Sequence, residues 1–282
     1  MKSLSLIIFF HFSIIQILLG DNSIPFKLVN NLIIIVADCD HSTGNFVFDT
    51  GSDAIFLNTP KKTETEAKTF NTLNGNVLTK LTKISCFKIG EITKKNIEAY
   101  KTNLSNIEDF LSIELAGIIG AELFNPHSIF IDFLQNKILF FKNPPNLYDY
   151  NLTNNIKFSM KLGVPTTEVI MLGEKYFFII DSGATIHLIS QDILTAIPDN
   201  FQKLDTGISI ETLENTSAKT KVKYKINSFK IGENTFTDQN CLSNDFSFLN
   251  ENQNKTISGV LSLTKLSKQG ILIDFHRMKI YY

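Results

Sequence analysis

The strongest constraint on this chain is an internal duplication, in which the same short motifs occur twice in the same order. The motif FKIG at residues 87–90 recurs at residues 229–232. In each copy a glycine followed by two aliphatic residues lies 30 positions further on, at Gly117 (87 to 117) and at Gly259 (229 to 259). A chance tetrapeptide match would not keep its neighbours at a fixed distance, so the chain is best explained as two homologous lobes.

Each copy also contains an Asp-Thr/Ser-Gly triplet, Asp49-Thr50-Gly51 in the first and Asp181-Ser182-Gly183 in the second. Both triplets follow a short apolar run, FVF before Asp49 and FFII before Asp181. A carboxylate at the end of an apolar strand is costly unless it is paired or functional. One such triplet is a weak signal, because it is also an ordinary turn, but two copies in matching positions indicate a common site.

Two equivalent carboxylates, one from each lobe, can meet where the lobes face each other. Like charges at short range cannot both ionise easily, so the pair holds one shared proton. One carboxylate can then act as a general base on a water molecule, while its protonated partner donates to the carbonyl under attack. The glycine after each Asp allows a sharp turn and a close approach. The pattern therefore predicts that Asp49 and Asp181 together activate one water molecule.

The local pattern along the chain is mainly that of β-strands. Short apolar or alternating runs are separated by polar turns that contain Gly or Asn, and helix signals are sparse. The expected fold is therefore all-β with few short helices. The expected strands are residues 32–37, 45–48, 54–57, 77–84, 176–180 and 271–275, and the expected short helices are residues 121–124, 191–196 (capped by Ser190) and 263–266.

The two triplet loops, residues 49–52 (DTGS) and 181–185 (DSGAT), resemble the active-site loops of retropepsin-like and pepsin-like aspartic proteases. Residues 117–120 (GIIG) resemble the hydrophobic-hydrophobic-Gly element of that family. The resemblance is closest to bacterial aspartyl proteases that carry two retropepsin-like units in one chain. It implies two homologous acid-protease lobes, each a closed β-barrel, with the active site at the lobe interface. It also implies a peptide or unfolded protein as substrate, and neither a metal nor an organic cofactor.

This resemblance assigns roles to particular positions. A flap over the cleft is expected at the turn that contains Asn74 and Gly75, and a second flap between Leu204 and Asn215. In the second hydrophobic element Ser262 replaces the glycine found at Gly120, which is a departure in the packing of the second lobe. The expected catalytic residues are Asp49 and Asp181, and the expected supporting residues of their loops are Thr50, Gly51, Ser52, Ser182, Gly183 and Ala184.

The position after each triplet glycine differs between the lobes, because it is Ser52 in the first and Ala184 in the second. In the family this position lies close to the preceding Asp. A hydroxyl there can donate a hydrogen bond to the charged carboxylate and favour its ionisation. The sequence therefore predicts that Ser52 donates to Asp49, and that Asp49 ionises before Asp181.

The N-terminus indicates export. Residues 1–20 combine Lys2 with an apolar run that ends at Gly20, which is typical of a cleaved signal peptide; an uncleaved anchor is the alternative. The expected location is secreted, periplasmic or cell-surface. The expected organisation is a first lobe at residues 21–142, a linker at residues 143–155 and a second lobe at residues 156–282. Because both lobes are in one chain, we expect a monomer without a membrane span in its mature part.

The composition favours this class over others. The 282 residues carry a formal net charge of −1 and no basic block, so nucleic acid is not an expected partner. Cys39, Cys86 and Cys241 show no C-x-x-C spacing, which argues against a zinc site and favours free buried thiols. His187, among aliphatic residues, is expected to be a hydrogen-bonded core histidine. Three alternatives remain: a non-catalytic protein that binds extended peptides, a Cys–His protease, and a structural cell-surface domain.

Overall fold

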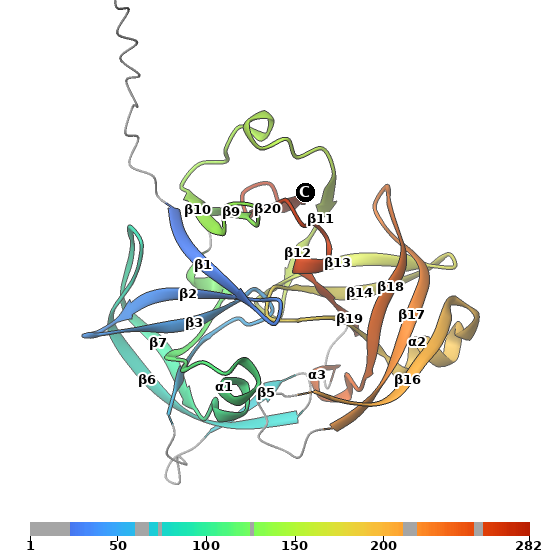
Figure 1. Cartoon of the computed structure of the whole chain (residues 1–282), viewed down its shortest axis with the longest axis horizontal. Coiled ribbons are helices and arrows are strands. Elements are labelled where there is room, and N and C mark those ends of the chain that lie inside the picture. Colours follow the sequence, from blue (N-terminus) through green and yellow to red (C-terminus); the bar gives the residue numbers. More distant parts are fainter. Residues whose placement is uncertain (1–22, 60–67, 73–74, 125–126, 211–218, 251–255) are drawn as a thin grey trace, which may run out of the picture.

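The computed structural model describes residues 23–59, 68–72, 75–124, 127–210, 219–250 and 256–282. Strands dominate these residues, and they form two lobes joined by a common sheet (Figure 1). The predicted signal peptide, residues 1–20, lies outside the described residues. Within the described part of the chain, no helix is both long and apolar enough to cross a membrane.

The first lobe is a closed barrel of six strands. Its strands pair in the order β2–β3–β8–β4–β7–β6, and β6 returns to pair with β2. Phe46, Phe48 and Phe87 are fully buried in it, and the rings of Phe46 and Phe87 meet edge to face at 5.4 Å. The strands are β2 (Leu32–Cys39), β3 (Ser42–Asp49), β4 (Ile55–Asn58), β6 (Gly75–Ile89), β7 (Ile92–Thr102) and β8 (Gly117–Gly120).

The second lobe repeats this barrel with the same pairing order, β13–β14–β19–β15–β18–β17, closed by β17 and β13. Phe178 and Phe229 take the places of Phe46 and Phe87, and Ile180 takes that of Phe48. The prediction of two homologous β-barrel lobes is thus confirmed. The strands are β13 (Val164–Met171), β14 (Glu174–Asp181), β15 (His187–Ser190), β17 (Lys219–Ile231), β18 (Asn234–Asn244) and β19 (Ile257–Ser262).

A sheet built from both lobes lies across the top of the molecule as drawn in Figure 1. Its strand order is β11–β21–β20–β9–β10–β1, and its centre is the antiparallel pair β20–β9, in which Asp274 lies opposite Ser128. Each half of the chain contributes three strands, so neither lobe completes this sheet alone. The strands are β1 (Ser23–Val29), β9 (Ser128–Asp132), β10 (Lys137–Phe141), β11 (Asn155–Lys157), β20 (Gly270–Asp274) and β21 (Lys279–Tyr281).

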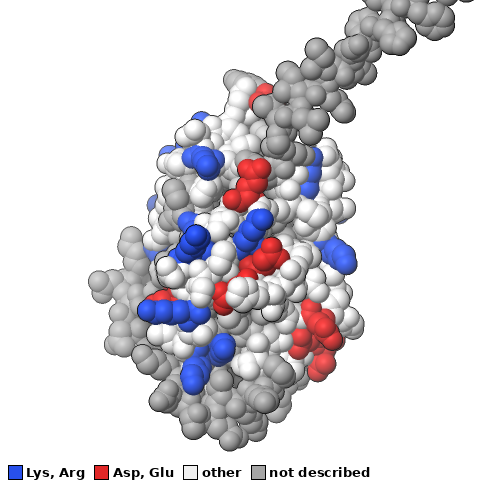
Figure 2. All heavy atoms as spheres, turned by 90° about the vertical axis from the view of Figure 1, so that its left-hand side faces the viewer, with Lys and Arg blue, Asp and Glu red and all other residues white. Residues whose placement is uncertain are grey.

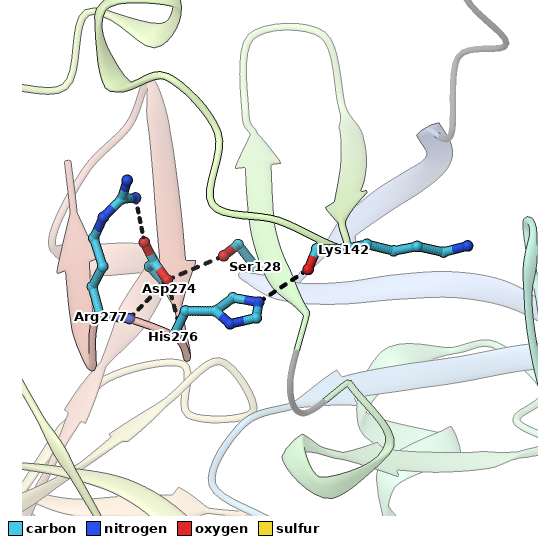
Figure 3. Close-up of polar contacts among 5 residues, drawn as sticks. All are labelled: Ser128, Lys142, Asp274, His276 and Arg277. Atoms are coloured by element: carbon cyan, nitrogen blue, oxygen red, sulfur yellow. Dashed lines mark hydrogen bonds and ion pairs between the residues drawn. The ribbon is translucent and has the colours of Figure 1, made fainter.

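Asp274 connects the two lobes within this sheet (Figure 3). It is fully buried, and its Oδ1 accepts from the Ser128 hydroxyl at 3.1 Å and from the backbone N–H of His276 and of Arg277 at 3.0 Å. Its Oδ2 pairs with the Arg277 guanidinium at 2.7 Å. A ring nitrogen of His276 lies 3.1 Å from the carbonyl oxygen of Lys142 in the first half of the chain. These contacts hold both halves together at one buried carboxylate.

Helices are few and short, as expected. The Ser190 hydroxyl accepts from the backbone N–H of Ile193 at 3.3 Å, which confirms the predicted cap of α2 (Gln191–Ala196). The short helices predicted after Gly120 and Ser262 are the 3₁₀ helices η1 (Ala121–Leu123) and η4 (Leu263–Lys265). The sequence did not predict α1 (Ser105–Leu111) and α3 (Ser247–Asn250), which are too short to show a helical period and follow β7 and β18 in the two lobes.

The remaining elements join or extend these sheets. Each lobe has a hairpin, formed by β5 (Lys68–Thr72) with β6 and by β16 (Phe201–Ile210) with β17. The predicted linker, residues 143–155, contains η2 (Leu147–Tyr150), and Leu147 and Tyr150 pack against the shared sheet. The other short elements are β12 (Ser159–Lys161) and η3 (Pro198–Asn200).

The surface charges seen in Figure 2 are mixed in sign, and the cysteines are free thiols. On the face seen in Figure 2, Lys and Arg are interspersed with Asp and Glu, and neither sign forms a continuous patch. This agrees with the net charge of −1. Cys39, Cys86 and Cys241 are all free thiols, as expected; Cys241 is buried, whereas Cys39 and Cys86 are half-buried.

Candidate active site

Asp49 and Asp181 are each the last residue of a barrel strand in their own lobe. Asp49 is the last residue of β3 and pairs with Gly120 of the parallel strand β8. Asp181 is the last residue of β14 and pairs with Ser262 of the parallel strand β19. The three residues before each Asp are buried, so each carboxyl group lies at the end of a buried strand segment. The duplicated sequence therefore places two carboxyl groups at equivalent positions.

The two triplets pack against each other across the lobe boundary. A Cβ atom added to Gly51 would lie 2.4 Å from Cγ of Asp181, and one added to Gly183 would lie 2.5 Å from Cγ of Asp49. Each glycine thus leaves room for the carboxyl group of the opposite lobe. The carboxyl groups of Asp49 and Asp181 share a hydrogen bond. The structure brings together the two residues that the sequence singled out.

Thr50 and Ser182 link the loops through a reciprocal set of buried hydrogen bonds. Each hydroxyl accepts from the backbone N–H of the other residue, at 2.9 Å to Ser182 Oγ and 3.0 Å to Thr50 Oγ1. Each hydroxyl also donates to a strand carbonyl of the opposite lobe: Thr50 to Ile180 at 2.9 Å and Ser182 to Phe48 at 2.7 Å. Each hydroxyl donates its one proton and accepts one hydrogen bond across the lobe boundary, so four hydrogen bonds fix the relative position of the loops.

The surroundings of the pair favour one shared proton. Burial raises the pKa of both Asp49 and Asp181, and the charge of Asp181 raises the pKa of Asp49 further. Backbone N–H groups act in the opposite direction: Gly51 donates to Asp49 at 2.8 Å and Gly183 to Asp181 at 2.6 Å. Ionising one carboxyl group is therefore supported by the loops, whereas ionising both would place two buried charges in contact.

The prediction that Ser52 donates to Asp49 is wrong. The Ser52 hydroxyl donates to the carbonyl oxygen of Ala54 at 3.1 Å and lies 3.3 Å from the backbone N–H of the same residue. A hydroxyl has one proton to donate, so it cannot also serve Asp49. The basis for assigning the first ionisation to Asp49 is therefore absent. The serine side chain is short, and its hydroxyl bonds the backbone of its own loop at Ala54 instead of the Asp49 carboxylate.

Ser262, which stands where the first lobe has Gly120, makes a side-chain contact that the first lobe lacks. A Cβ atom on Gly120 would meet Ala54 O at 2.5 Å and Ser52 O at 2.6 Å, so the first lobe admits only glycine there. In the second lobe Ser262 is fully buried, and its hydroxyl donates to the carbonyl oxygen of Ala184 at 2.7 Å. The second loop thus gains a side-chain hydrogen bond where the first has backbone packing.

The flap predictions lie partly beyond the described residues. Gly75 begins β6 and pairs with Thr72 of β5, so it belongs to the hairpin of the first lobe. Asn74 lies outside the described residues. In the second lobe the predicted turn between Leu204 and Asn215 begins within β16 and continues into residues 211–218, which are also outside them. Hairpins thus stand at equivalent places in the two lobes.

Sequence reasoning missed one contact behind the first loop. Gly163, in the turn between β12 and β13, has φ +76°, and a Cβ atom there would lie 2.5 Å from Cβ of Asp53. A turn of the second lobe therefore lies against the end of the first active-site loop. The positive φ makes glycine a natural choice, but only the folded structure shows which residue lies opposite.

Comparison with known proteins agrees with this geometry. Residues 167–264 match the family model described as aspartyl protease. The fold of the whole chain is similar to that in the crystal structure of the aspartic proteinase from Irpex lacteus, with a TM-score of 0.55 and 12% identity over 92% of this chain and 96% of that one. No curated protein matches this chain.

These findings confirm the resemblance to the aspartic protease family, and the fold is similar to that of an aspartic proteinase. The family match falls on the second lobe, from β13 to η4, and the structural likeness extends over both lobes. The closer resemblance to bacterial proteases with two units in one chain stays a prediction.

Proposed function

We propose that this protein is an aspartic endopeptidase in which Asp49 and Asp181 together activate one water molecule. The observation that carries the proposal is the crossed packing of the triplets, in which each glycine makes room for the opposite carboxyl group. Two carboxyl groups that share a hydrogen bond and have raised pKa values form an acid and a base in one site. The family match and the fold support a protease.

In the proposed reaction the pair begins with one proton. The ionised carboxylate takes a proton from the water as the water oxygen attacks the peptide carbonyl carbon, and the protonated carboxyl group donates to the carbonyl oxygen. The tetrahedral intermediate collapses when the pair donates a proton to the amide nitrogen, the C–N bond breaks and the amine leaves. One hydroxyl of the intermediate returns its proton to the pair as the carbonyl bond re-forms, so the pair again holds one proton. The Thr50–Ser182 hydrogen bonds hold the two carboxyl groups in place throughout.

We further propose an extended peptide or an unfolded segment of protein as the substrate. Asp49 and Asp181 come from opposite lobes, so a chain lying between the lobes would reach both. The hairpins β5–β6 and β16–β17 are the proposed flaps.

Substitution of either aspartate tests the proposal. A random peptide library is digested with the wild type, Asp49→Asn and Asp181→Asn, and the products are sequenced. We expect each variant to lose at least about 10²-fold in rate, because one acid–base group is lost. Asp132→Asn is the control, since Asp132 caps a turn at Leu134 and Gln135 away from the triplets.

Full activity in either site variant would contradict the proposed pair. A wild type that binds library peptides but cuts none would instead favour the alternative of a non-catalytic peptide-binding protein.

A further inference from the structure

A buried histidine, His187, lies beside the loop that carries Asp181. It is the first residue of β15 and is only 2% exposed. Its Nδ1 accepts a hydrogen bond from the backbone N–H of Ser262 at 3.0 Å. Because Nδ1 accepts, the other ring nitrogen carries the proton, and the imidazole also hydrogen-bonds the side chain of Gln239. The expectation of a hydrogen-bonded core histidine is confirmed, with a defined tautomer.

Ser262 connects this histidine to the proposed active site. It lies opposite Asp181 in the pairing of β19 with β14. Its hydroxyl donates to the carbonyl oxygen of Ala184, two residues after Ser182 in the loop. The contacts therefore run from the imidazole to the backbone of Ser262, and from the Ser262 side chain to the Asp181 loop.

The first lobe has an apolar version of the same arrangement. Phe56 pairs with Ile118 as Leu188 pairs with Val260, so Ile55 occupies the place of His187. Glycine at position 120 leaves no space for a side chain beneath the first loop. A polar pair, His187 and Ser262, thus replaces an isoleucine and a glycine in the second lobe only.

We propose that His187 is a positioning residue for the Asp181 loop, and that it holds Ser262 in place only as the neutral imidazole. The proposal deepens the function proposed above and rests on it. In the imidazolium both ring nitrogens are donors. The Nδ1–H would then point at the Ser262 N–H, so β19 and the Ala184 contact would have to shift. Protonation of His187 would therefore disturb the Asp181 loop without touching either carboxyl group.

The surroundings keep the imidazole neutral until the solution is quite acidic. The pKa of His187 is lowered to about 4, mainly by burial; the Gln239 hydrogen bond acts in the opposite direction, and the charge of Lys265 adds to the lowering. Cys241, opposite His187 on β18, is neutral because burial raises the pKa of its thiol to about 12. On β17 the neighbour is the ring of Phe229, at 6.1 Å. None of these neighbours supplies the negative charge that would stabilise an imidazolium.

Two substitutions at position 187 separate acceptor chemistry from packing. His187→Asn keeps an acceptor near the place of Nδ1 but cannot be protonated. His187→Ile copies the first lobe and removes the acceptor at every pH. His276→Asn is the control, because His276 contacts the Lys142 carbonyl in the shared sheet, away from the triplets.

We expect the peptidase rate of the wild type to fall faster below about pH 4 than that of His187→Asn. At pH 3 about one tenth of His187 is neutral, because one pH unit below a pKa is a factor of ten. Relative to pH 5, His187→Asn should therefore retain up to about tenfold more activity than the wild type. His187→Ile should have a lower kcat at all pH values, and His276→Asn should follow the wild type.

Amide exchange at Ser262 gives a second readout that needs no activity. As pH falls through about 4, the ratio of the Ser262 amide exchange rate in the wild type to that in His187→Asn should rise. The reason is that protonated Nδ1 no longer accepts the Ser262 N–H in the wild type. The role of His187 would be overturned if the wild type and His187→Asn lost peptidase rate equally at acidic pH and also exchanged the Ser262 amide equally. This result would leave the proposed peptidase activity itself intact. An inactive wild type would refute the proposed peptidase, while exchange at Ser262 would still decide the histidine contact.

Discussion

Only glycine fits at positions 51 and 183. A methyl group on Gly51 would overlap the carboxyl group of Asp181, and one on Gly183 would overlap that of Asp49. The sequence could identify both triplets, because a costly carboxylate followed by glycine occurs twice. It could not predict where the Ser52 hydroxyl points, because the backbone of Ala54, two residues further on, also offers a hydrogen-bond acceptor to a short side chain. The sequence pattern thus predicted which carboxyl groups form the site, but not which hydrogen bonds the neighbouring side chains make.

Removing one carboxyl group should stabilise the protein at neutral pH. The pKa of Asp181 is raised in the folded state above its ordinary value of 3.8. Such a group contributes stability at low pH that is lost as pH rises through its folded pKa, because the folded state then binds more protons than the unfolded state. We expect Asp181→Asn to have a higher Tm than the wild type at pH 7 and no advantage near pH 3, measured by thermal unfolding across pH.

The comparison of variant with wild type cancels the other titrating groups, among them His187, whose lowered pKa acts with the opposite sign. Asp132→Asn serves as the matched control. A Tm of Asp181→Asn that stays below the wild type at pH 7 would show that the carboxyl pair is not destabilising.

At the scale of elements, several strands and the short helices α2, η1 and η4 could be predicted, whereas α1 and α3 could not. Strands β2, β3 and β14 carry enough apolar residues to reveal a pattern. The four residues of α3 and the seven of α1 are too few to show a helical period in the sequence. The sequence also revealed that Ser262 differs from Gly120, but the hydroxyl contact with Ala184 required the fold.

The difference between β8 and β19 predicts unequal effects of exchanging their last residues. Gly120→Ser would drive Cβ into two backbone carbonyl oxygens that cannot move freely, which should cost about 1–3 kcal/mol or more in the free energy of unfolding. Ser262→Gly removes the hydroxyl contacts with Ala184 O and Thr264 Oγ1 but creates no overlap, and should cost about 1 kcal/mol.

Denaturant unfolding of both variants measures this difference. Equal losses of stability, or a larger loss for Ser262→Gly, would contradict the proposed packing beneath the two loops.

At the scale of the whole molecule, the duplication predicted two lobes, but it did not predict the sheet they share. The strands β11 and β21 have only three residues each, and β20 pairs with a strand more than 100 positions away in the chain. Such short strands gain their stability from partners that are distant in sequence, so local patterns do not reveal them. Asp274 illustrates this, because its contacts with Ser128 join the ends of the two lobes.

Because both aspartates and both halves of the shared sheet are in one chain, we expect the active species to be a monomer. Activity per mole should be independent of protein concentration, and sedimentation should show a single species of one chain. Specific activity that rises with concentration, together with a dimer in sedimentation, would contradict this.

Joining the two lobes covalently also changes how the site can diverge. In an enzyme assembled from two identical subunits, every substitution appears on both sides of the site at once. Here Ile55 and His187, or Gly120 and Ser262, can differ because each is encoded separately. A substitution that does not fit beneath the first loop can therefore occur beneath the second. One half of the site can in this way acquire a chemical property that the other half lacks.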